Sequence, residues 1–377
     1  MKTFQEMGLS EALLSTLKDI QFTIPTPIQS KAIPLALQGK DILGSAQTGT
    51  GKTGAFGIPL VSKLLSSSRG KALVITPTRE LASQVMSQLK LMLGNNSNIK
   101  SALLIGGESL PKQERQIQSR PRIIVGTPGR INDHLSRGVL MLHDADFLVL
   151  DETDRMLDMG FACQIDNIMK YMTGKRQTLL FSATLPKNII NIARKYQNNA
   201  EYIAVNHTST PATKVKQDLL RISQSEKYLK LLDQLDKRQG SIVIFVKTKY
   251  GTEKMAEKLS KMGFSADAIH GNLNQNKRDR VISAFRDKKY RILVATDIAA
   301  RGLDIPHIEH VINYDLPQCA EDYIHRIGRT ARAGATGSAL NLVSPEDRKK
   351  WNAIYRLLNQ NEANSSQYSN FENNRLN

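Results

Sequence analysis

Short, almost continuous apolar runs alternate with longer amphipathic segments through the first half of the chain. Such runs are typical of parallel strands buried on both faces, and the amphipathic segments are typical of helices that cover the sheet. The pattern predicts an α/β fold with a mainly parallel sheet and helices on both faces. The expected strands are 72–76, 101–105, 123–127, 147–150, 178–181 and 202–205.

Residues 206–213 interrupt this alternation, because they contain Thr, Ser, Pro and Ala without apolar periodicity. The alternation then starts again, and the expected strands are 242–246, 266–269, 292–295, 310–313 and 338–343. The sequence therefore predicts a first domain at 1–205, a linker at 206–215 and a second domain at 216–350. Residues 351–377 begin as an amphipathic helix and become rich in Asn and Ser, so we expect a short, largely disordered tail.

Near the start of the chain, leucines recur at helical spacing. Leu9, Leu13, Leu14 and Leu17 would share one helix face, and Ser10 stands where an N-cap is expected. We expect this leucine stripe to belong to the core.

Residues 46–53, Ala-Gln-Thr-Gly-Thr-Gly-Lys-Thr, form the densest motif of the chain. Backbone N–H groups of a glycine-rich loop that opens a helix can surround phosphate, and Gly49 and Gly51 would permit the close approach. Lys52 could reach the β- and γ-phosphates, and the Thr53 hydroxyl could ligate Mg²⁺. The alternative is a flexible turn, but the helix-compatible segment that follows favours a nucleotide site.

Two carboxylates follow the apolar run 147–150. Ligands of open α/β sheets bind at the carboxyl ends of the strands. There Asp151 could hold the Mg²⁺ shell, and Glu152 could orient or deprotonate the attacking water. A charged turn between strand and helix is the alternative, which the phosphate loop makes less favourable.

Three arginines, Arg326, Arg329 and Arg332, recur at near-helical intervals in the second half. They could supply the positive charge that phosphoryl transfer needs, or they could form a solvated basic helix face. The segment alone does not decide between these interpretations.

The charge balance adds a partner to this picture. The chain has 52 Lys and Arg against 35 Asp and Glu, a net charge of +17. Nucleic acid is the first polyanion that this charge suggests, an anionic membrane surface is the second, and a merely basic protein is the alternative. Without a signal-like or membrane-spanning apolar run, we expect a cytoplasmic protein in which Cys163 and Cys319 are reduced thiols.

As an ordered set, the motifs from Phe4 to about Ser344 resemble those of the DEAD-box ATP-dependent RNA helicases of superfamily 2, in particular the bacterial RhlE-like branch. The resemblance implies two RecA-like domains, ATP and Mg²⁺ as cofactors, and RNA as the partner. The segment 151–154, Asp-Glu-Thr-Asp, resembles the name-giving motif but has Thr153 in place of its alanine.

The resemblance also implies the residues of an ATP site. Segment 22–29 is similar to the Q motif, in which Gln29 would read the adenine edge with Phe22 and Phe4 nearby, although Gln21 stands at a usual glycine position. In this interpretation the phosphate groups are bound by Gly49, Gly51, Lys52 and Thr53, and Asp304 approaches the ribose. Mg²⁺ would be held by Thr53 and Asp151, partly through water. The catalytic residues would be Lys52, Asp151, Glu152 and the arginine fingers Arg329 and Arg332.

RNA would be bound mainly through its sugar-phosphate backbone, because helix N-termini, small hydroxyls and arginines suit phosphate and 2′-OH groups. The implied RNA-binding residues are Pro77, Thr78, Arg79, Gly107, Thr127, Pro128, Gly129, Arg130, Gln275, Arg278 and Thr296. Asn272 and Asn274 replace the family's usual acidic residue and serine, so we expect a different grip on RNA there. The implied interdomain coupling residues are Ser182, Thr184, Arg301, His325 and Arg326.

The implied function is an RNA-dependent ATPase that closes two domains on ATP and single-stranded RNA. It would unwind short RNA duplexes locally or remodel RNA–protein complexes, with ribosome-assembly or RNA-decay proteins as further partners. Two alternatives stay open. One is an ATP-dependent RNA clamp with little unwinding, which Thr153 keeps in view, and the other is a DNA-directed superfamily 2 translocase.

Overall fold

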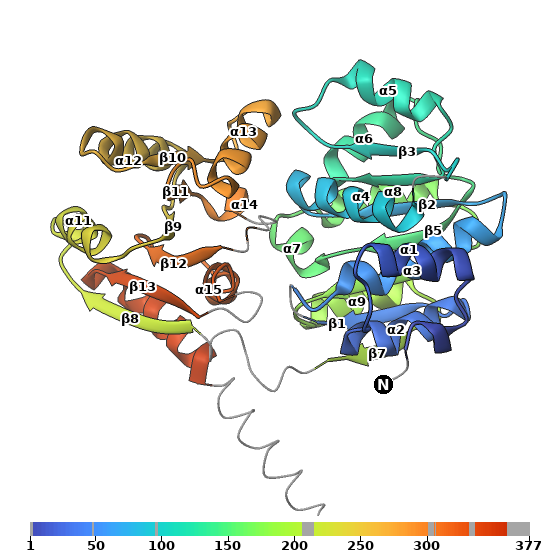
Figure 1. Ribbon diagram of the computed structural model, residues 1–377, viewed down its shortest axis with the longest axis horizontal. Helices are drawn as coiled ribbons and strands as arrows, with labels where there is room; N and C mark the ends of the chain where they lie inside the picture. The colour runs from blue at the N-terminus through green and yellow to red at the C-terminus, as the bar shows by residue number, and fades with distance from the viewer. Residues whose placement is uncertain are drawn as a thin grey trace, which may run out of the picture. The chain divides into compact units, whose positions relative to one another are not determined.

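The computed structural model describes residues 3–46, 49–94, 97–205, 215–300, 305, 307–331 and 336–359. The chain divides into two compact units, Met1–Asn206 and His207–Asn377 (Figure 1). Of the expected linker, only Val215 lies within the described residues, where it begins a strand. The predicted linker boundaries therefore stay a prediction.

The first unit contains a seven-stranded sheet in the order β3-β4-β2-β5-β6-β1-β7, and every neighbouring pair is parallel. The strands are β1 (Ile42–Ser45), β2 (Lys71–Ile75), β3 (Ser101–Leu104), β4 (Ile123–Gly126), β5 (Ala145–Leu150), β6 (Gln177–Ser182) and β7 (Glu201–Ala204). Strand β1 was not expected from the apolar pattern. Its Gly44 faces Phe181 of the neighbouring strand so closely that an added Cβ would lie 2.6 Å from the ring.

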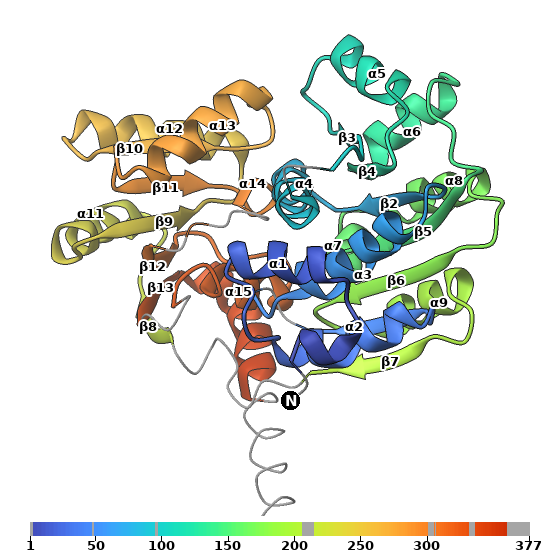
Figure 2. The same cartoon turned by 45° about the vertical axis from the view of Figure 1, so that its right-hand side comes forward.

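Helices cover both faces of this sheet (Figures 1 and 2). One set packs with Ala72 and Val74, and the other packs with Leu73 and Ile75 on the opposite face. The first set is α1 (Glu11–Asp19), α2 (Pro27–Leu37), α3 (Lys52–Ser66) and α4 (Arg79–Leu93), after the short η1 (Gln5–Met7). The second set is α5 (Leu110–Gln118), α6 (Pro128–Ser136), α7 (Thr153–Asp158), α8 (Ala162–Tyr171) and α9 (Lys187–Tyr196).

The leucine stripe near the start of the chain lies in the core, as predicted. Leu9, Leu13 and Leu17 are buried, and Leu14 packs against the same cluster. The Ser10 hydroxyl accepts a hydrogen bond from the Leu13 backbone N–H at 3.4 Å, so Ser10 is the N-cap of α1.

The second unit contains a six-stranded sheet in the order β10-β11-β9-β12-β13-β8, again with parallel neighbours. The strands are β8 (Val215–Arg221), β9 (Ser241–Phe245), β10 (Ala266–Ile269), β11 (Ile292–Ala295), β12 (Ile308–Asn313) and β13 (Gly337–Val343). Strand β8 was missed by the sequence prediction. Among the described strands, β8 pairs only with β13. An edge strand of this kind can keep polar residues, which is why the apolar pattern did not reveal it.

Helices α11 (Lys227–Lys237) and α12 (Lys249–Lys261) cover one face of the second sheet. The other face is covered by α13 (Gln275–Arg286), α14 (Asp297–Ala300), α15 (Ala320–Ile327) and a helix at 348–359 that follows η2 (Pro345–Asp347). Ile354 of the last helix is buried in the core. The packed part of this unit thus extends past the predicted boundary at 350, and residues 360–377 lie outside the described part of the chain.

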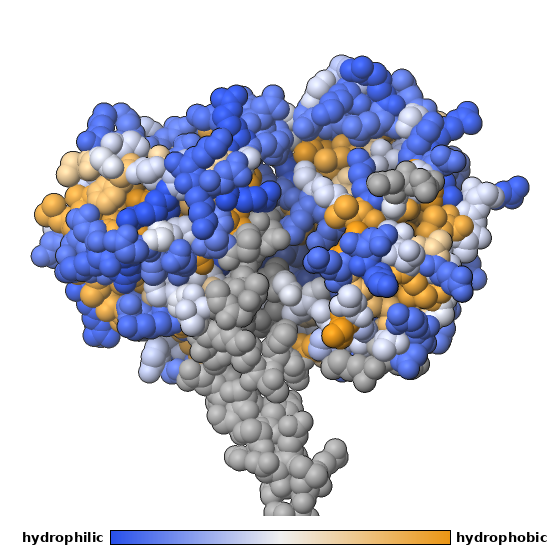
Figure 3. Space-filling model, in the orientation of Figure 1, coloured by the Kyte–Doolittle hydropathy of each residue, from blue (hydrophilic) through white to orange (hydrophobic). Residues whose placement is uncertain are grey.

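The face of the molecule in Figure 3 is mixed in hydropathy. Hydrophilic residues cover much of the face in Figure 3, with smaller hydrophobic patches between them. In the part of the chain that the structure describes, no helix is both long enough and apolar enough to cross a membrane. Cys163 and Cys319 are both exposed and form no disulfide.

Candidate active site

The carboxyl ends of the first sheet carry two sets of predicted residues. The phosphate loop follows β1, the two carboxylates follow β5, and Ser182 ends β6. The predicted RNA-binding segments follow β2, β3 and β4. Because the strand order is β3-β4-β2-β5-β6-β1-β7, each set occupies its own continuous half of one sheet edge.

The phosphate loop uses glycine where the backbone requires it. Gly49 and Gly51 have φ angles of 83° and 91°, in the left-handed region that other residues rarely adopt. A Cβ at Gly51 would lie 2.6 Å from Gln29 Nε2, so close packing also excludes a side chain there. Helix α3 begins directly afterwards at Lys52, and Thr53 lies in its first turn.

Lys52 is buried, and its Nζ has no hydrogen-bond partner among the described residues. A buried ammonium without a partner is costly, so this side chain suits an incoming anion. Burial raises the pKa of the Asp151 carboxyl, and the positive charge of Lys52 opposes this rise. The resulting pKa of Asp151 is about 6. The phosphate loop and the first carboxylate therefore interact electrostatically.

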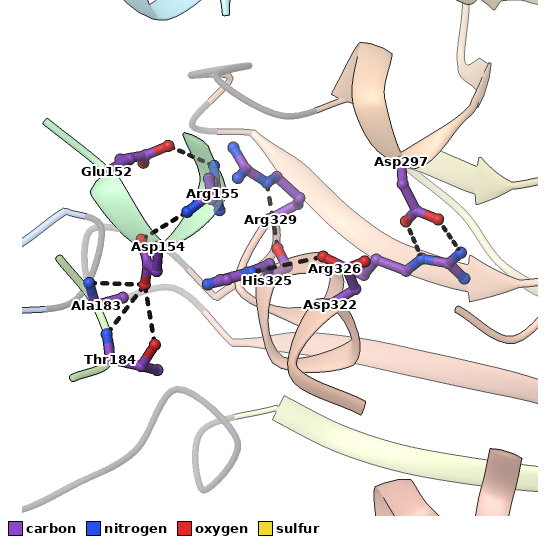
Figure 4. Close-up of polar contacts among 10 residues, drawn as sticks. All are labelled: Glu152, Asp154, Arg155, Ala183, Thr184, Asp297, Asp322, His325, Arg326 and Arg329. Atoms are coloured by element: carbon purple, nitrogen blue, oxygen red, sulfur yellow. Dashed lines mark hydrogen bonds and ion pairs between the residues drawn. The ribbon is translucent and has the colours of Figure 1, made fainter. Parts of the chain in front are cut away.

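Glu152 is held by an arginine that the sequence interpretation did not include. Arg155 Nη1 donates to Glu152 Oε2 at 2.7 Å, and both side chains are buried (Figure 4). The backbone N–H of Glu152 donates to Asp151 Oδ1 at 2.9 Å, and its φ angle is 52°. The spacing of three residues on one helix was the only signal that could have indicated this pair.

Asp154, in the first turn of α7, is hydrogen-bonded to the segment that follows β6. Its Oδ2 accepts hydrogen bonds from the backbone N–H groups of Ala183 and Thr184, each at 3.0 Å, and from Thr184 Oγ1 at 3.2 Å (Figure 4). Ser182 Oγ donates to the Thr184 carbonyl at 2.6 Å. Ser182 and Thr184 are thus fixed within the first unit, and their interdomain role stays a prediction.

Thr153 does not disturb this cluster. Its side chain is buried, and its Oγ1 donates to the Leu150 carbonyl at 3.2 Å, away from Asp154 and its partners. We therefore expect Thr153→Ala to change the rate of ATP hydrolysis by less than about threefold, a small barrier change. Steady-state assays of wild type, Thr153→Ala and the hydroxyl-retaining Thr153→Ser measure this. A much faster alanine variant would show that the natural residue is a brake.

The predicted adenine-reading residue is attached to the phosphate loop. Gln29 Oε1 accepts from the Thr26 N–H at 2.9 Å, and its Nε2 donates to the Gly51 carbonyl at 3.0 Å. The amide retains a second N–H and a second lone pair, so adenine reading stays a prediction. Phe22 is half-buried next to Gly54. Gln21 has a φ angle of 62°, which explains why glycine suits that position.

Phe4, the predicted aromatic residue near the adenine, lies in a hydrophobic cluster. Only 2% of Phe4 is exposed, and it packs within the hydrophobic core of the first unit. The structure therefore places Phe4 in this core, and its contact with the nucleotide stays a prediction. Burial of this kind depends on tertiary packing, which an isolated aromatic position does not reveal.

The predicted RNA-binding residues of the first unit follow three adjacent strands, and their contact with RNA stays a prediction. Pro77 and Pro128 are buried, and Thr78 Oγ1 caps α4 by accepting from the Leu81 N–H at 3.3 Å. The Arg79 guanidinium lies against Gly106, where an added Cβ would be 3.2 Å from Nη2. The residues Thr127, Gly129 and Arg130 follow β4. Arg130 Nη1 donates to the Glu108 carbonyl, beside Gly107, at 3.1 Å.

In the second unit, the predicted RNA-binding residues follow the adjacent strands β10 and β11. Asn274 caps α13 by accepting from the Lys277 N–H at 2.9 Å, a role that suits asparagine as well as serine. Gln275 Nε2 donates to Asp279 Oδ1, and Thr296 is buried.

Arg278 is buried as well, with 4% of the residue exposed. Its Nη1 donates to the His270 carbonyl at 3.0 Å, so the guanidinium helps to join α13 to the end of β10. Asn272 Oδ1 accepts from Lys249 Nζ at 2.7 Å. The replacement of an acidic residue by asparagine thus leaves a neutral partner for an exposed lysine.

Arg326 is bound inside the second unit. It donates to both carboxylate oxygens of Asp297, at 2.5 and 2.7 Å (Figure 4). It also donates to the Asp315 carbonyl at 2.6 Å. Its guanidinium also lies 4.7 Å from the centre of the Phe245 ring. These contacts give Arg326 a positioning role within its own unit, and its interdomain coupling role stays a prediction.

The other residues of the arginine segment are only partly described. Arg329 is 5% exposed, and its Nε donates to the His325 carbonyl at 3.3 Å (Figure 4). The predicted residues Arg301, Asp304 and Arg332 lie outside the described residues.

Two family models match the chain. Residues 26–192 match the DEAD/DEAH box helicase model, and residues 224–334 match the helicase conserved C-terminal domain. The DEAD-box ATP-dependent RNA helicase CshA of Geobacillus kaustophilus is 45% identical over 349 residues, which cover 92% of this chain and 74% of the relative. The Bacillus subtilis CshA is 42% identical over 354 residues, covering 93% and 72%.

Solved structures have the same architecture. Saccharomyces cerevisiae Dbp5 bound to RNA and ADP BeF3 is similar with a TM-score of 0.84 and 30% identity, covering 96% of this chain and 93% of that chain. Mss116p bound to single-stranded RNA and AMP-PNP is similar with a TM-score of 0.83 and 28% identity, covering 92% and 75%. Both sheets of this chain are thus RecA-like. The chain belongs to the DEAD-box RNA helicase family.

Proposed function

We propose that the protein is an RNA-dependent ATPase that closes its two domains on ATP and single-stranded RNA. Closure would unwind short RNA duplexes locally or remodel RNA–protein complexes. The observation that carries this proposal is the division of the first sheet edge into a phosphate half after β5, β6 and β1 and an RNA half after β3, β4 and β2. One rigid sheet can then respond to both ligands.

ATP would be held by the phosphate loop and hydrolysed beside Glu152. Lys52 would offset the charge of the β- and γ-phosphates, and Glu152 would orient or deprotonate the attacking water. The buried Asp151 carboxylate and the Thr53 hydroxyl offer the oxygen ligands that Mg²⁺ prefers, and the ion would offset phosphate charge when bound there. Arg329 and Arg332 would stabilise the charge that develops on the transferred phosphoryl group.

RNA would be held by its backbone along the other half of the edge and by the second unit. A strand held in this way in a bent path cannot remain in a regular duplex, so closure would separate a few base pairs. The Dbp5 and Mss116p structures are complexes with RNA and a nucleotide analogue, which supports simultaneous binding here. If both ligands prefer the closed state, each must raise the affinity for the other.

The cellular setting is a further part of the proposal. We infer a cytoplasmic protein whose partners, besides RNA, are ribosome-assembly or RNA-decay proteins. The RhlE-like branch stays a prediction, and the CshA relatives reported above favour a different branch.

The test is ATP hydrolysis at one salt concentration without nucleic acid, with single-stranded RNA, and with DNA of the same sequence. We expect hydrolysis to be slow alone and to rise at least about tenfold with RNA but not with DNA, as a coupled system requires. Equal stimulation by DNA would favour the translocase. Stimulation by RNA without strand separation of a short duplex would favour the clamp.

A further inference from the structure

Two asparagines lie near the carboxyl ends of two inner strands of the second sheet, where buried side chains are usually apolar. Asn313 of β12 and Asn341 of β13 are both 0% exposed and are register partners. Side chains two residues apart on a strand point to the same face of the sheet. Val311 and Ala339, two residues before the asparagines, pack in the core on the face that α15 covers, so both asparagine side chains point to that face. Buried polar groups at such positions require partners.

The partners form one continuous chain of hydrogen bonds. Arg326 Nη1 donates to Asn313 Oδ1 at 2.9 Å, and Asn313 Nδ2 donates to Asn341 Oδ1 at 2.8 Å. Asn341 Nδ2 then donates to the Tyr323 hydroxyl at 3.0 Å, which donates to Gln217 Oε1 at 2.7 Å. Each group in this hydrogen-bond chain donates to the next group farther from Arg326.

This direction has a physical origin. A guanidinium can only donate, so it requires the oxygen of Asn313, and that choice sets the orientation of each following group. Burial raises the pKa of Tyr323 to about 12, so its hydroxyl keeps the proton that it donates. Hydrogen bonds in such a chain polarise one another, and breaking one link leaves buried groups unsatisfied.

Two members of this hydrogen-bond chain belong to α15, the helix that precedes Arg329. Tyr323 and Arg326 lie one turn apart on α15 and point to the same sheet face. Asn341 Nδ2 also donates to the Asp218 carbonyl of β8 at 3.2 Å. The hydrogen-bond chain therefore fixes the rotation of α15 relative to three strands. The Arg329 guanidinium in turn donates to the His325 carbonyl of that helix.

We propose that Asn341 is a positioning residue for ATP turnover, because the hydrogen-bond chain centred on it sets the rotation of α15 and hence the place of Arg329. This inference rests on the proposed function, in which Arg329 acts on the transferred phosphoryl group. Asn341 lies on β13, a strand that carries none of the predicted site residues.

The test compares Asn341→Leu, the double variant Asn313→Leu/Asn341→Leu, and Tyr323→Phe. The control is Ser241→Ala, which removes a buried hydroxyl bonded to the His307 carbonyl at the amino end of β9 in the same sheet. For Asn341→Leu we expect the RNA-stimulated kcat to fall about tenfold or more, because a small misplacement of a catalytic group is costly. The KM for ATP and the affinity for RNA should change less than about threefold, and Ser241→Ala should keep its kcat.

The double variant separates positioning from stability. It removes two polar partners together, so the melting temperature should recover toward that of wild type while kcat stays low. Recovery of both quantities, or an unchanged kcat in Asn341→Leu, would overturn the proposal. If Asn341→Leu does not fold, Tyr323→Phe decides, because a kcat equal to that of wild type also overturns it. A wild-type protein that RNA does not stimulate would instead refute the proposed function itself.

Discussion

Glu152→Gln is expected to lower RNA-stimulated ATP hydrolysis by at least about 100-fold, the usual worth of a general base. The amide has the shape of the carboxylate and can still accept the hydrogen bond from Arg155, so the buried site should keep its structure. It cannot take a proton from the attacking water. ATP binding should therefore change less than about threefold, because only an interaction of the transition state is lost.

The measurement pairs single-turnover hydrolysis with equilibrium ATP binding. Glu257→Gln is the matched control, because Glu257 is an exposed carboxylate whose partner is Lys261, on the same helix α12. The control should hydrolyse ATP as wild type does. Hydrolysis at the wild-type rate by Glu152→Gln would remove Glu152 from its proposed role.

Lys52→Ala is expected to have a comparably large effect, for a different reason. The Lys52 ammonium is buried without a hydrogen-bond partner in the described structure, so phosphate would be its natural counter-charge. Its removal should weaken ATP binding and lower kcat/KM by at least about 100-fold, since charge-assisted phosphate contacts are strong. RNA binding in the absence of nucleotide should stay close to wild type.

Three quantities test the Lys52 prediction together: kcat/KM, the Kd for ATP, and the Kd for RNA without ATP. Lys63→Ala is the matched control, because Lys63 lies on the same helix α3 but pairs with Asp146 at 3.1 Å. An unchanged Kd for ATP in Lys52→Ala would mean that the loop binds no phosphate. A loss of RNA binding would indicate a damaged fold.

The apolar runs were sufficient to predict most of the sheet but not its irregular strands. Strands β2 to β7 and β9 to β13 lie within a few residues of the expected runs. Strand β1 has few apolar residues, and its Gly44 depends on contact with Phe181. Strand β8 is polar because it is an edge strand. In both strands the decisive neighbours are distant in the sequence.

The same limit applies to the candidate site. Lys52 and Glu152 stand in local motifs whose spacing predicts phosphate chemistry, and the structure places both at one sheet edge. The partners of Arg326 within its own unit were not predicted, because nothing local shows that Asp297 and Asn313 surround it. Asn341 was not predicted, since a single asparagine in an apolar run carries no motif. Roles that depend on tertiary neighbours require the folded structure.

The coupling of ATP and RNA is the central claim, and the Glu152→Gln protein tests it most directly because it should bind ATP without consuming it. The measurement is the Kd for single-stranded RNA with and without saturating ATP and Mg²⁺, at one salt concentration. Closure on both ligands predicts that ATP tightens RNA binding by about tenfold or more. The same Kd in both conditions would contradict it.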